Sequence, residues 1–356
     1  KLGATICVLA GAVLNIKNVT AKYKTHWIGS KSMDVKLDEK AVKYYDENYV
    51  PLFLYIQKAT TGGYEIADVL TGTTRKGTYY VCDSDPKCRF CGKTAPEVSF
   101  KEKAHLFSEC LGNKLFVSKN NECDICNSIF SKYEMDLNTF VYPYLVLNHI
   151  HGKNGVRKYR SNDKSSRIEY TDDGIRITDT LGKTKIQEDE AAKEIRYEFD
   201  LNSYSLSNVY RILLKMALSI LPEGDFKKFT IATNSLVNRK LLGCEVLSLS
   251  FFPGFNRFEF TVMGYAKKVN NSQIPSYQFA IMNGNFLLQI PIFSDDELRS
   301  NVGKSIQFEV VPIPTPFDNI AIMGNKTNHI FRVENDLMTP STKMTATLKY
   351  DGKTEL

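Results

Sequence analysis

The amino-acid sequence predicts an α+β protein in three parts: a small β-rich unit in residues 1–82, a compact cysteine-bound unit in residues 83–150, and a large strand-rich α+β domain in residues 151–356. Three observations lead to this prediction. Short strand-like runs outnumber helical periods, two Cys-x-x-Cys pairs bracket the middle of the second part, and a basic run opens the third. The length of 356 residues suits two or three domains, and 43% hydrophobic and 24% charged residues are typical of globular proteins.

Charge and cysteine usage indicate the kind of partner and the compartment. A net charge of +6 permits an anionic partner without requiring one. Four of the eight cysteines are scattered, so no disulfide framework is expected, and a thiolate metal site favours the reducing cytoplasm. The apolar run 2–14 resembles the core of a signal peptide or a buried strand pair or short helix. It is too short to cross a bilayer, so we expect a soluble protein without a membrane segment.

In the first part, the expected elements are strands at 21–28, 50–57, 64–70 and 78–82 and a short charged helix at 36–48. The Gly62-Gly63 pair reads as a tight hairpin turn between two of these strands. No combination of side chains here indicates catalysis.

The second part carries the clearest signal. Cys88, Cys91, Cys123 and Cys126 form two pairs that can close a tetrahedral zinc site. Short strands are expected at 98–100 and 104–107, followed by a helix at 124–148 whose apolar residues recur at helical spacing. The turn expected at the first Cys-x-x-Cys pair is a zinc knuckle. A knuckle, a β-hairpin and a helix that supplies the last two cysteines make up a treble-clef arrangement.

The third part is expected to form a large antiparallel sheet with one helix at 207–221, which begins at a serine and stops before Pro222. Its candidate strands lie at 167–170, 175–178, 194–200, 229–233, 245–252, 257–265, 277–282, 286–292, 305–311 and 344–350.

A resemblance to a known family rests on the second part. The segments Cys88-Arg-Phe-Cys91-Gly92, Ala104-His105, Leu111-Gly112-Asn113 and Cys123-Asp-Ile-Cys126-Asn127 stand in the order CxxCG, AH, LGN, CxxCN. This stretch resembles the HNH endonuclease family, in its four-cysteine, zinc-containing branch. The resemblance implies a ββα-metal nuclease domain, a structural Zn²⁺ on the four cysteines, and hydrolysis of DNA phosphodiesters with a catalytic Mg²⁺ or Mn²⁺.

The resemblance also implies roles for single residues. His105 is expected to be the general base, and Asn127 to present an amide oxygen to the catalytic ion. The alternative for His105 is an inert surface histidine, and the alternative for Asn127 is an amide that caps the helix or supports the thiolates. The loop-holding asparagine of the family corresponds to Asn113, Asn120 or Asn121.

The chain departs from the family beside His105. Many members carry an acid directly before the histidine, where this chain has Ala104. We expect Glu134 to replace that acid, because it stands seven residues after Asn127 and therefore on the same helical face. Glu109 ranks second, and Glu122 is also close in sequence. A solvated helix face is the alternative for Glu134.

The basic run that follows the second part is a candidate DNA contact. Non-specific phosphate affinity is expected from Lys153, Arg157, Lys158, Arg160 and Arg167. A solvated linker is the alternative.

The sequence therefore predicts a metal-dependent endonuclease acting on double-stranded DNA, in keeping with a bacterial or phage defence or restriction-type effector. The alternative is a non-catalytic, zinc-stabilised protein that binds nucleic acid or senses a signal. The large third part is compatible with a homo-oligomer or with a regulatory ligand.

Overall fold

The structure is a computed structural model that describes residues 35–36, 38–82, 85–152, 155–171, 174–180, 185–252, 258–301, 306, 308–315, 318–320 and 324–349. The run 2–14 and the expected strand 21–28 lie outside these residues.

A large antiparallel sheet of eight strands forms the centre of the α+β fold, as the sequence predicted. Residues 49–76 and 246–332 both contribute strands to it. The spatial order is β21 (Thr327–Arg332), β15 (Val246–Phe251), β18 (Phe286–Ile292), β17 (Tyr277–Gly284), β16 (Phe258–Lys267), β2 (Tyr49–Thr60), β3 (Gly63–Asp68) and β4 (Thr73–Lys76).

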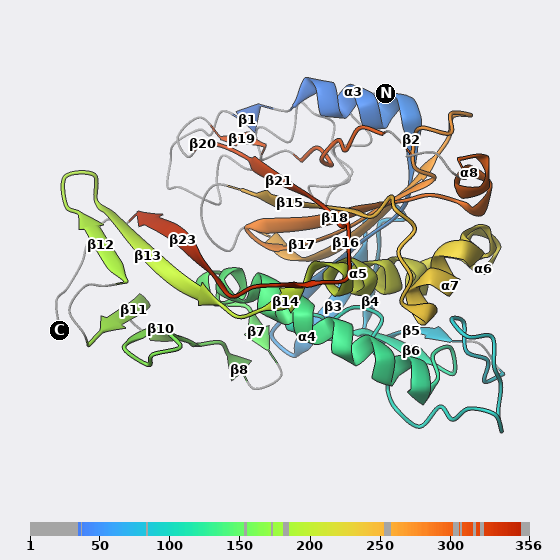
Figure 1. Cartoon of the computed structure of the whole chain (residues 1–356), viewed down its shortest axis with the longest axis horizontal. Coiled ribbons are helices and arrows are strands. Elements are labelled where there is room, and N and C mark those ends of the chain that lie inside the picture. Colours follow the sequence, from blue (N-terminus) through green and yellow to red (C-terminus); the bar gives the residue numbers. More distant parts are fainter. Residues whose placement is uncertain are drawn as a thin grey trace.

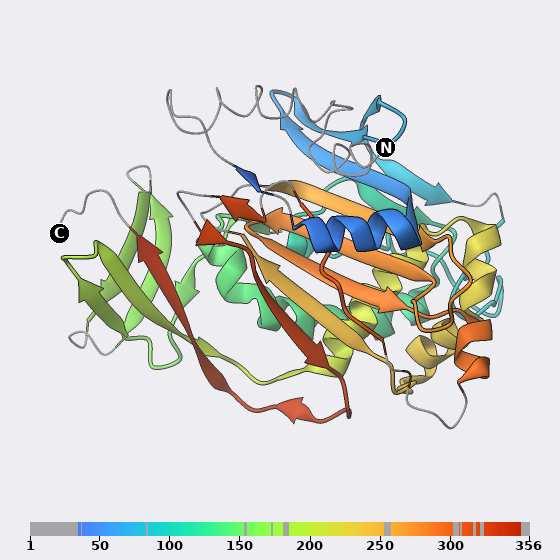
Figure 2. The ribbon, with the colours of Figure 1, turned by 90° about the horizontal axis from the view of Figure 1, so that it is seen from above.

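Both faces of this sheet are covered, so its central strands are apolar on both sides. Successive side chains of a strand point to opposite faces. Phe279 and Ile281 of β17 accordingly belong to one core cluster, whereas Ala280 and Met282 belong to another. Helix α3 (Glu39–Asn48) covers the second face, and the remaining long helices lie under the first (Figures 1 and 2).

Two long helices form successive layers under the first face of the sheet. Helix α5 (Leu206–Ile220) is buried along almost its whole length, and α4 (Asp124–Leu147) packs against it (Figure 1). Smaller helices flank this layer: α6 (Glu223–Phe226), η2 (Lys227–Phe229), α7 (Thr230–Asn238) and α8 (Asp295–Ser300). Among the helices of the described residues, none is long and apolar enough to cross a bilayer.

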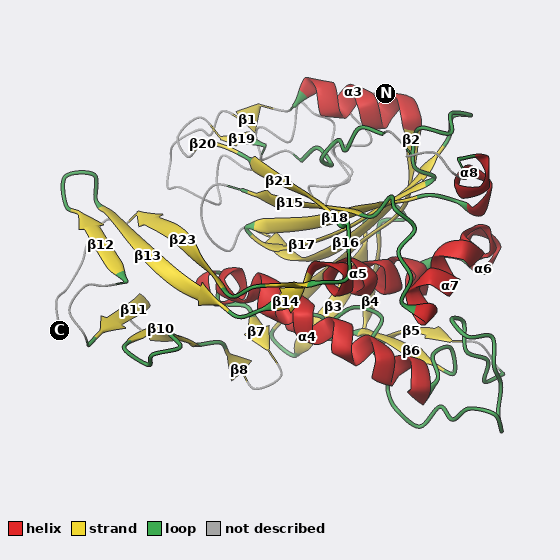
Figure 3. Ribbon diagram, in the orientation of Figure 1, coloured by secondary structure: helices red, strands yellow, loops and turns green. Residues whose placement is uncertain are grey.

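Short sheets surround this centre (Figure 3). They are β1 (Val35–Lys36) with β19 (Asn319–Ile320) and β20 (Gly324–Asn325); β5 (Tyr79–Cys82) with β6 (Phe116–Lys119); β7 (His151–Gly152) with β8 (Gly155–Val156); β9 (Tyr159–Arg160), β10 (Ser166–Thr171) and β11 (Gly174–Asp179); β12 (Ile186–Asp189), β13 (Glu194–Leu201) and β23 (Thr342–Lys349); and β14 (Tyr204–Ser205) with β22 (Met338–Thr339).

The main hydrophobic core joins residues from all three parts that the sequence suggested. It contains Phe53 from β2, Phe107 from the cysteine-bound segment and Phe260 from β16, all buried. The segment between the cysteine pairs is therefore packed directly onto the large sheet, which fixes the position of the candidate site.

Candidate metal centre and histidine site

The four paired cysteines meet at the amino end of α4. The sulfurs of Cys88, Cys91, Cys123 and Cys126 all lie within 4.8 Å of one another. Cys123 caps the helix and Cys126 lies in its first turn, while the other two flank a tight turn that Gly92 completes with a φ of 73°. In the described part of the chain, no other set of three or more His, Cys, Asp or Glu side chains gathers its ligand atoms this closely.

The chemistry of this cluster suits a structural zinc ion. Four sulfur donors in a buried, closed arrangement are the usual ligand set of structural Zn²⁺. A hydrogen bond from the Cys126 thiol lowers the pKa of Cys88 to about 5, and backbone N–H groups, Cys91's among them, act in the same direction. The thiolate is the metal-binding form, and Cys88 favours it, whereas burial raises the pKa of Cys123 and the hydrogen bond to Cys88 raises that of Cys126.

His105 lies on a short hairpin between the two cysteine pairs. Its neighbours Ala104 and Leu106 pair with β6: the Ser118 N–H donates to the Ala104 carbonyl oxygen at 2.8 Å, and the Leu106 N–H donates to the Phe116 carbonyl oxygen at 3.2 Å. The segment expected as a strand at 104–107 makes a single antiparallel bridge, between His105 and Val117 of β6, and neither it nor residues 98–100 form a strand. The order along the chain is knuckle, hairpin, helix.

Asn113 holds the loop of this hairpin together. Its side chain is fully buried, and its nitrogen donates to the carbonyl oxygens of Phe107 and Phe116 at 2.8 and 2.9 Å. Its oxygen accepts from the N–H groups of Phe116 and of the preceding residue, at 2.9 and 3.2 Å. Asn120 and Asn121, the other two candidates for this role, instead offer backbone carbonyls to the first knuckle.

Two amides of the large sheet clamp the same loop, and the sequence did not single out either. Gln57 of β2 donates to the Gly112 carbonyl oxygen at 2.9 Å and accepts from the Lys114 N–H at 2.8 Å. Asn283 of β17 donates to the Leu111 carbonyl oxygen at 2.7 Å. Gly112 is required here, because its φ is +97° and a Cβ would lie 2.6 Å from the Asn283 amide nitrogen.

The surroundings of His105 keep its imidazole neutral. The side chain is half-buried, and burial is the main reason that its pKa is lowered below the ordinary 6.5. Lys215, Lys103 and Lys114 lower this pKa further, while the carboxylate of Glu109 opposes them. A neutral imidazole at pH 7 is able to accept a proton.

Glu134 belongs to the same group of charges. Burial raises its pKa, the nearby Glu109 carboxylate does the same, and the Lys215 ammonium and the Ser108 hydroxyl oppose them. Glu109 lies 3.7 Å from the ammonium of Lys114. His105, Glu109 and Glu134 therefore share neighbours, although they do not form a set of three ligands as close as that of the cysteines.

Asn127 lies next to the cysteine cluster. Its N–H donates to the Cys123 carbonyl oxygen at 2.9 Å in the first turn of α4. Within the described residues, its side chain makes no hydrogen bond, and nothing joins it to the charges around His105.

A buried ion pair completes the site. Lys215 of α5 lies 3.0 Å from the carboxylate of Glu122, and its ammonium also donates to the carbonyl oxygen of His105. Glu122 was expected as an acid of the site only after Glu134 and Glu109, and Lys215 was not among the expected site residues. The available signal was a single lysine inside the apolar run at 212–221.

The basic run is partly used for packing. Lys153 lies outside the described residues. Arg157 is half-buried and donates to the Asn138 side chain of α4 at 3.1 Å and to the carbonyl oxygen of Cys110 at 3.3 Å. Arg157 therefore fastens the run to the loop that follows His105.

The remaining cations of the run are at the surface. Lys158 and Arg167 both pair with Glu169, at 3.2 and 2.6 Å, so part of their charge is neutralised within the protein. Arg160 is exposed.

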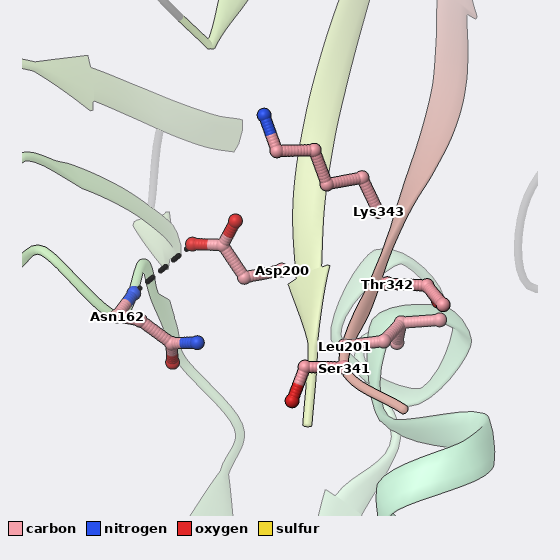
Figure 4. Close-up of a pocket in the computed structure, with 6 residues that line it drawn as sticks. All are labelled: Asn162, Asp200, Leu201, Ser341, Thr342 and Lys343. Atoms are coloured by element: carbon pink, nitrogen blue, oxygen red, sulfur yellow. Dashed lines mark hydrogen bonds between the residues drawn. The ribbon is translucent and has the colours of Figure 1, made fainter. Parts of the chain in front are cut away.

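A surface hollow lies apart from this site, beside the β13–β23 ribbon (Figure 4). Its main charges have partners: Asp200 accepts from the Asn162 N–H at 3.1 Å and pairs with Lys185 at 2.7 Å, and Lys343 pairs with Glu198 at 2.7 Å. It has no histidine or cysteine in its lining, so we assign no chemistry to it.

No protein-family model matches this chain, and no curated protein or solved structure proved significantly similar to it.

Proposed function

We propose that this chain is a metal-dependent endonuclease of the HNH type that hydrolyses DNA phosphodiester bonds. The observation that supports this most is the placement of His105 on a hairpin between two cysteine pairs whose sulfurs converge, followed at once by α4. A knuckle, a hairpin with a histidine and a helix in this order are the parts of a treble-clef ββα-metal nuclease.

In this proposal His105 is the general base. Its neutral imidazole takes the proton of the attacking water, and the lowered pKa supports this role because the base form is then present at neutral pH. Lys103 and Lys114, which lie close enough to affect His105, offer positive charge to the phosphate. The four cysteines and their zinc hold the shape and take no part in the reaction.

A catalytic Mg²⁺ or Mn²⁺ fits the carboxylates near His105 rather than a complete cage. Mg²⁺ commonly takes one or two carboxylates from the protein and keeps several waters. Glu134, with Glu109 beside it, is the proposed carboxylate ligand. The resemblance adds the amide of Asn127, which would reach this ion only after movement, because in the described part of the chain no contact joins its side chain to the charges around His105. When bound, the ion would neutralise charge on the phosphate and on the leaving oxygen.

The proposed substrate is double-stranded DNA in the cytoplasm. Arg160, Lys158 and Arg167 remain the proposed backbone contacts of the basic run, because their side chains are exposed and phosphate can compete for the two that pair with Glu169. The defence role, the homo-oligomer and the regulatory ligand remain proposals of lower priority.

One observation favours the alternative function, a zinc-stabilised nucleic-acid-binding or sensing protein without catalysis. The cysteine group is the one multi-ligand metal cluster in the described part of the chain, so the second ion site is incomplete without ligand movement.

Supercoiled plasmid distinguishes the two functions. The zinc-loaded protein is incubated with plasmid and Mg²⁺ or Mn²⁺, with and without chelator, and zinc content is measured in parallel. We expect metal-dependent nicking, and a roughly 10²- to 10⁴-fold slower reaction for His105→Ala. His151→Ala, a change at an exposed histidine, is the matched control and should cleave normally. Plasmid retention without nicking in any metal would support the alternative.

A further inference from the structure

A lysine is buried in the middle of helix α5, where an apolar residue would pack more simply. Lys215 is only 2% exposed and stands between Leu214 and Met216 in a helix that is apolar on both sides of it. Burial of an ammonium costs several kcal/mol unless it is paired, and replacement of a buried ion pair by apolar residues is often neutral or stabilising. Packing alone therefore does not account for this lysine.

The polar contacts of the Lys215 ammonium lead to the candidate catalytic hairpin and to the start of α4, and the ammonium also lies 5.9 Å from the ring centroid of Phe130. Its ammonium donates to the backbone carbonyl of His105 and lies 3.0 Å from the carboxylate of Glu122, whose side chain is 1% exposed. Glu122 directly precedes the zinc-site residue Cys123. One ammonium thus joins the segment that carries His105 to the segment that enters the cysteine cluster, and it does so from a helix more than 80 residues further along the chain.

The same charge also faces the functional side chains. Lys215 acts on both His105 and Glu134, and in each case it favours the form that the proposed reaction needs: the neutral imidazole and the ionised carboxylate. The alternative role of Lys215 is to neutralise the buried carboxylate of Glu122. That role does not require the hydrogen bond between the Lys215 ammonium and the His105 carbonyl.

We propose that Lys215 is a positioning residue for phosphodiester cleavage: its hydrogen bond to the His105 carbonyl fixes the hairpin, and with it the imidazole, relative to α5. This inference rests on the proposed endonuclease function. It makes α5, which packs on the large sheet, an essential support of the site, so the segment 83–150 alone is not expected to be a competent nuclease.

The test separates positioning from charge balance. Lys215→Met removes the ammonium and leaves Glu122 unpaired, so part of its effect will be loss of stability. The double variant Lys215→Met/Glu122→Gln removes both charges and is expected to fold and to keep its zinc. Arg211→Met is the matched control: Arg211 is 4% exposed, lies one turn earlier in α5 and pairs with Asp336 at 2.7 Å, away from His105.

Cleavage of plasmid is measured for each zinc-loaded full-length protein, per folded molecule. We expect kcat to fall roughly 10- to 100-fold in both Lys215 variants, with KM changed less than about threefold, because a displaced base slows chemistry more than binding. Arg211→Met should retain its kcat. The proposal is overturned if the double variant recovers the wild-type kcat, or if Arg211→Met loses as much.

Failure of the underlying function has a different signature. If the wild-type protein itself cleaves no polynucleotide in Mg²⁺ or Mn²⁺, both the endonuclease function and the role of Lys215 in cleavage are refuted. If the wild type cleaves and His105→Ala does not, the function stands, and the Lys215 variants decide the positioning role alone.

Discussion

The two ends of helix α4 are supported in different ways. At the amino end, Glu122 and Cys126 lie among other buried or half-buried polar groups, and Glu134 does so about three turns into the helix. At the carboxyl end, Val146 and Leu147 pack against aromatic residues of the small sheets, and a buried cation beside these sheets, Lys185, is paired with Asp200 at 2.7 Å. With 24 residues, and a rise of about 1.5 Å per residue, the helix separates the two environments by about 36 Å.

This difference between the two ends indicates which end is constrained by function as well as by stability. Apolar packing such as that of Leu147 stabilises a helix end at little cost. Buried charge does not, unless each group is paired. Clusters of buried groups with shifted pKa values are typical of functional sites, which is the reason for assigning the chemistry to the amino end.

The largest effect is expected when the metal cluster is broken. Cys126→Ser removes one ligand, and structural zinc in small domains contributes about 10 kcal/mol or more to folding. We expect loss of zinc and of the cooperative unfolding transition at the amino end, measured by metal analysis and thermal unfolding. Cys244→Ser, at a buried cysteine outside the cluster, should keep its zinc and lose about 1–2 kcal/mol. A zinc-loaded Cys126→Ser protein of normal stability would contradict the assignment.

The next effect tests the carboxyl end. Phe199 of β13 is fully buried against Tyr159 and Tyr197, so Phe199→Ala should lower the free energy of unfolding by about 3–5 kcal/mol. Because this cluster is apolar and remote from the cysteines, zinc content and cleavage per folded molecule should not change. Phe199→Leu, which refills most of the volume, should recover more than half of the stability. A loss of zinc in Phe199→Ala would mean that the two ends are coupled.

A smaller stability loss, but with a functional consequence, is expected from Asn113→Ala. The change breaks four hydrogen bonds in the hairpin loop and leaves buried backbone groups unpaired, at a cost of about 2–3 kcal/mol. Since the loop follows His105, kcat should fall along with stability. Asn148→Ala, at a buried asparagine of the carboxyl end, is the control for stability and should leave kcat unchanged. Equal kcat values for the two variants would remove Asn113 from the site.

The sequence predicted the strands and helices whose hydrophobic spacing is visible within one segment, and it predicted the cysteine cluster from the spacing of its pairs. The expected strands at 50–57, 277–282 and 286–292 are confirmed as parts of β2, β17 and β18, and the expected helices as α4 and α5. The four cysteines converge as their spacing indicated.

Long-range contacts account for what the sequence did not predict. The expected strand at 229–233 is wrong: Phe229 ends η2 and residues 230–233 begin α7, because Ala232 and Leu236 form a buried helical stripe and the distant Asp295 accepts from the Ile231 N–H at 2.8 Å. The supports of the hairpin have the same origin. Gln57, Asn283 and Lys215 come from strands and a helix far from His105 in sequence, so no local motif identifies them.

The smallest expected effect is a change in the pH dependence of stability. It is compared at two histidines, one near each end of α4. Burial lowers the pKa of His105 at the amino end and of His149 after the carboxyl end of α4. In both cases the unfolded chain binds the proton at a higher pH than the folded protein. Each neutral imidazole therefore contributes fully to the free energy of unfolding above pH 6.5, the ordinary pKa of histidine. This contribution is lost as the pH falls from 6.5 through the lowered pKa of the folded protein.

Stability and cleavage should therefore respond differently to the two changes. His105→Gln and His149→Gln should each flatten the fall in the unfolding free energy below pH 6.5, as measured by denaturant titration across pH. Cleavage should depend on His105 alone: in the wild type and in His149→Gln, the acid limb of kcat/KM should lie below pH 6.5, because the base loses activity only when it is protonated. An acid limb above pH 6.5, or one that moves in His149→Gln, would exclude His105 as the base and leave the amino end of α4 with a structural role.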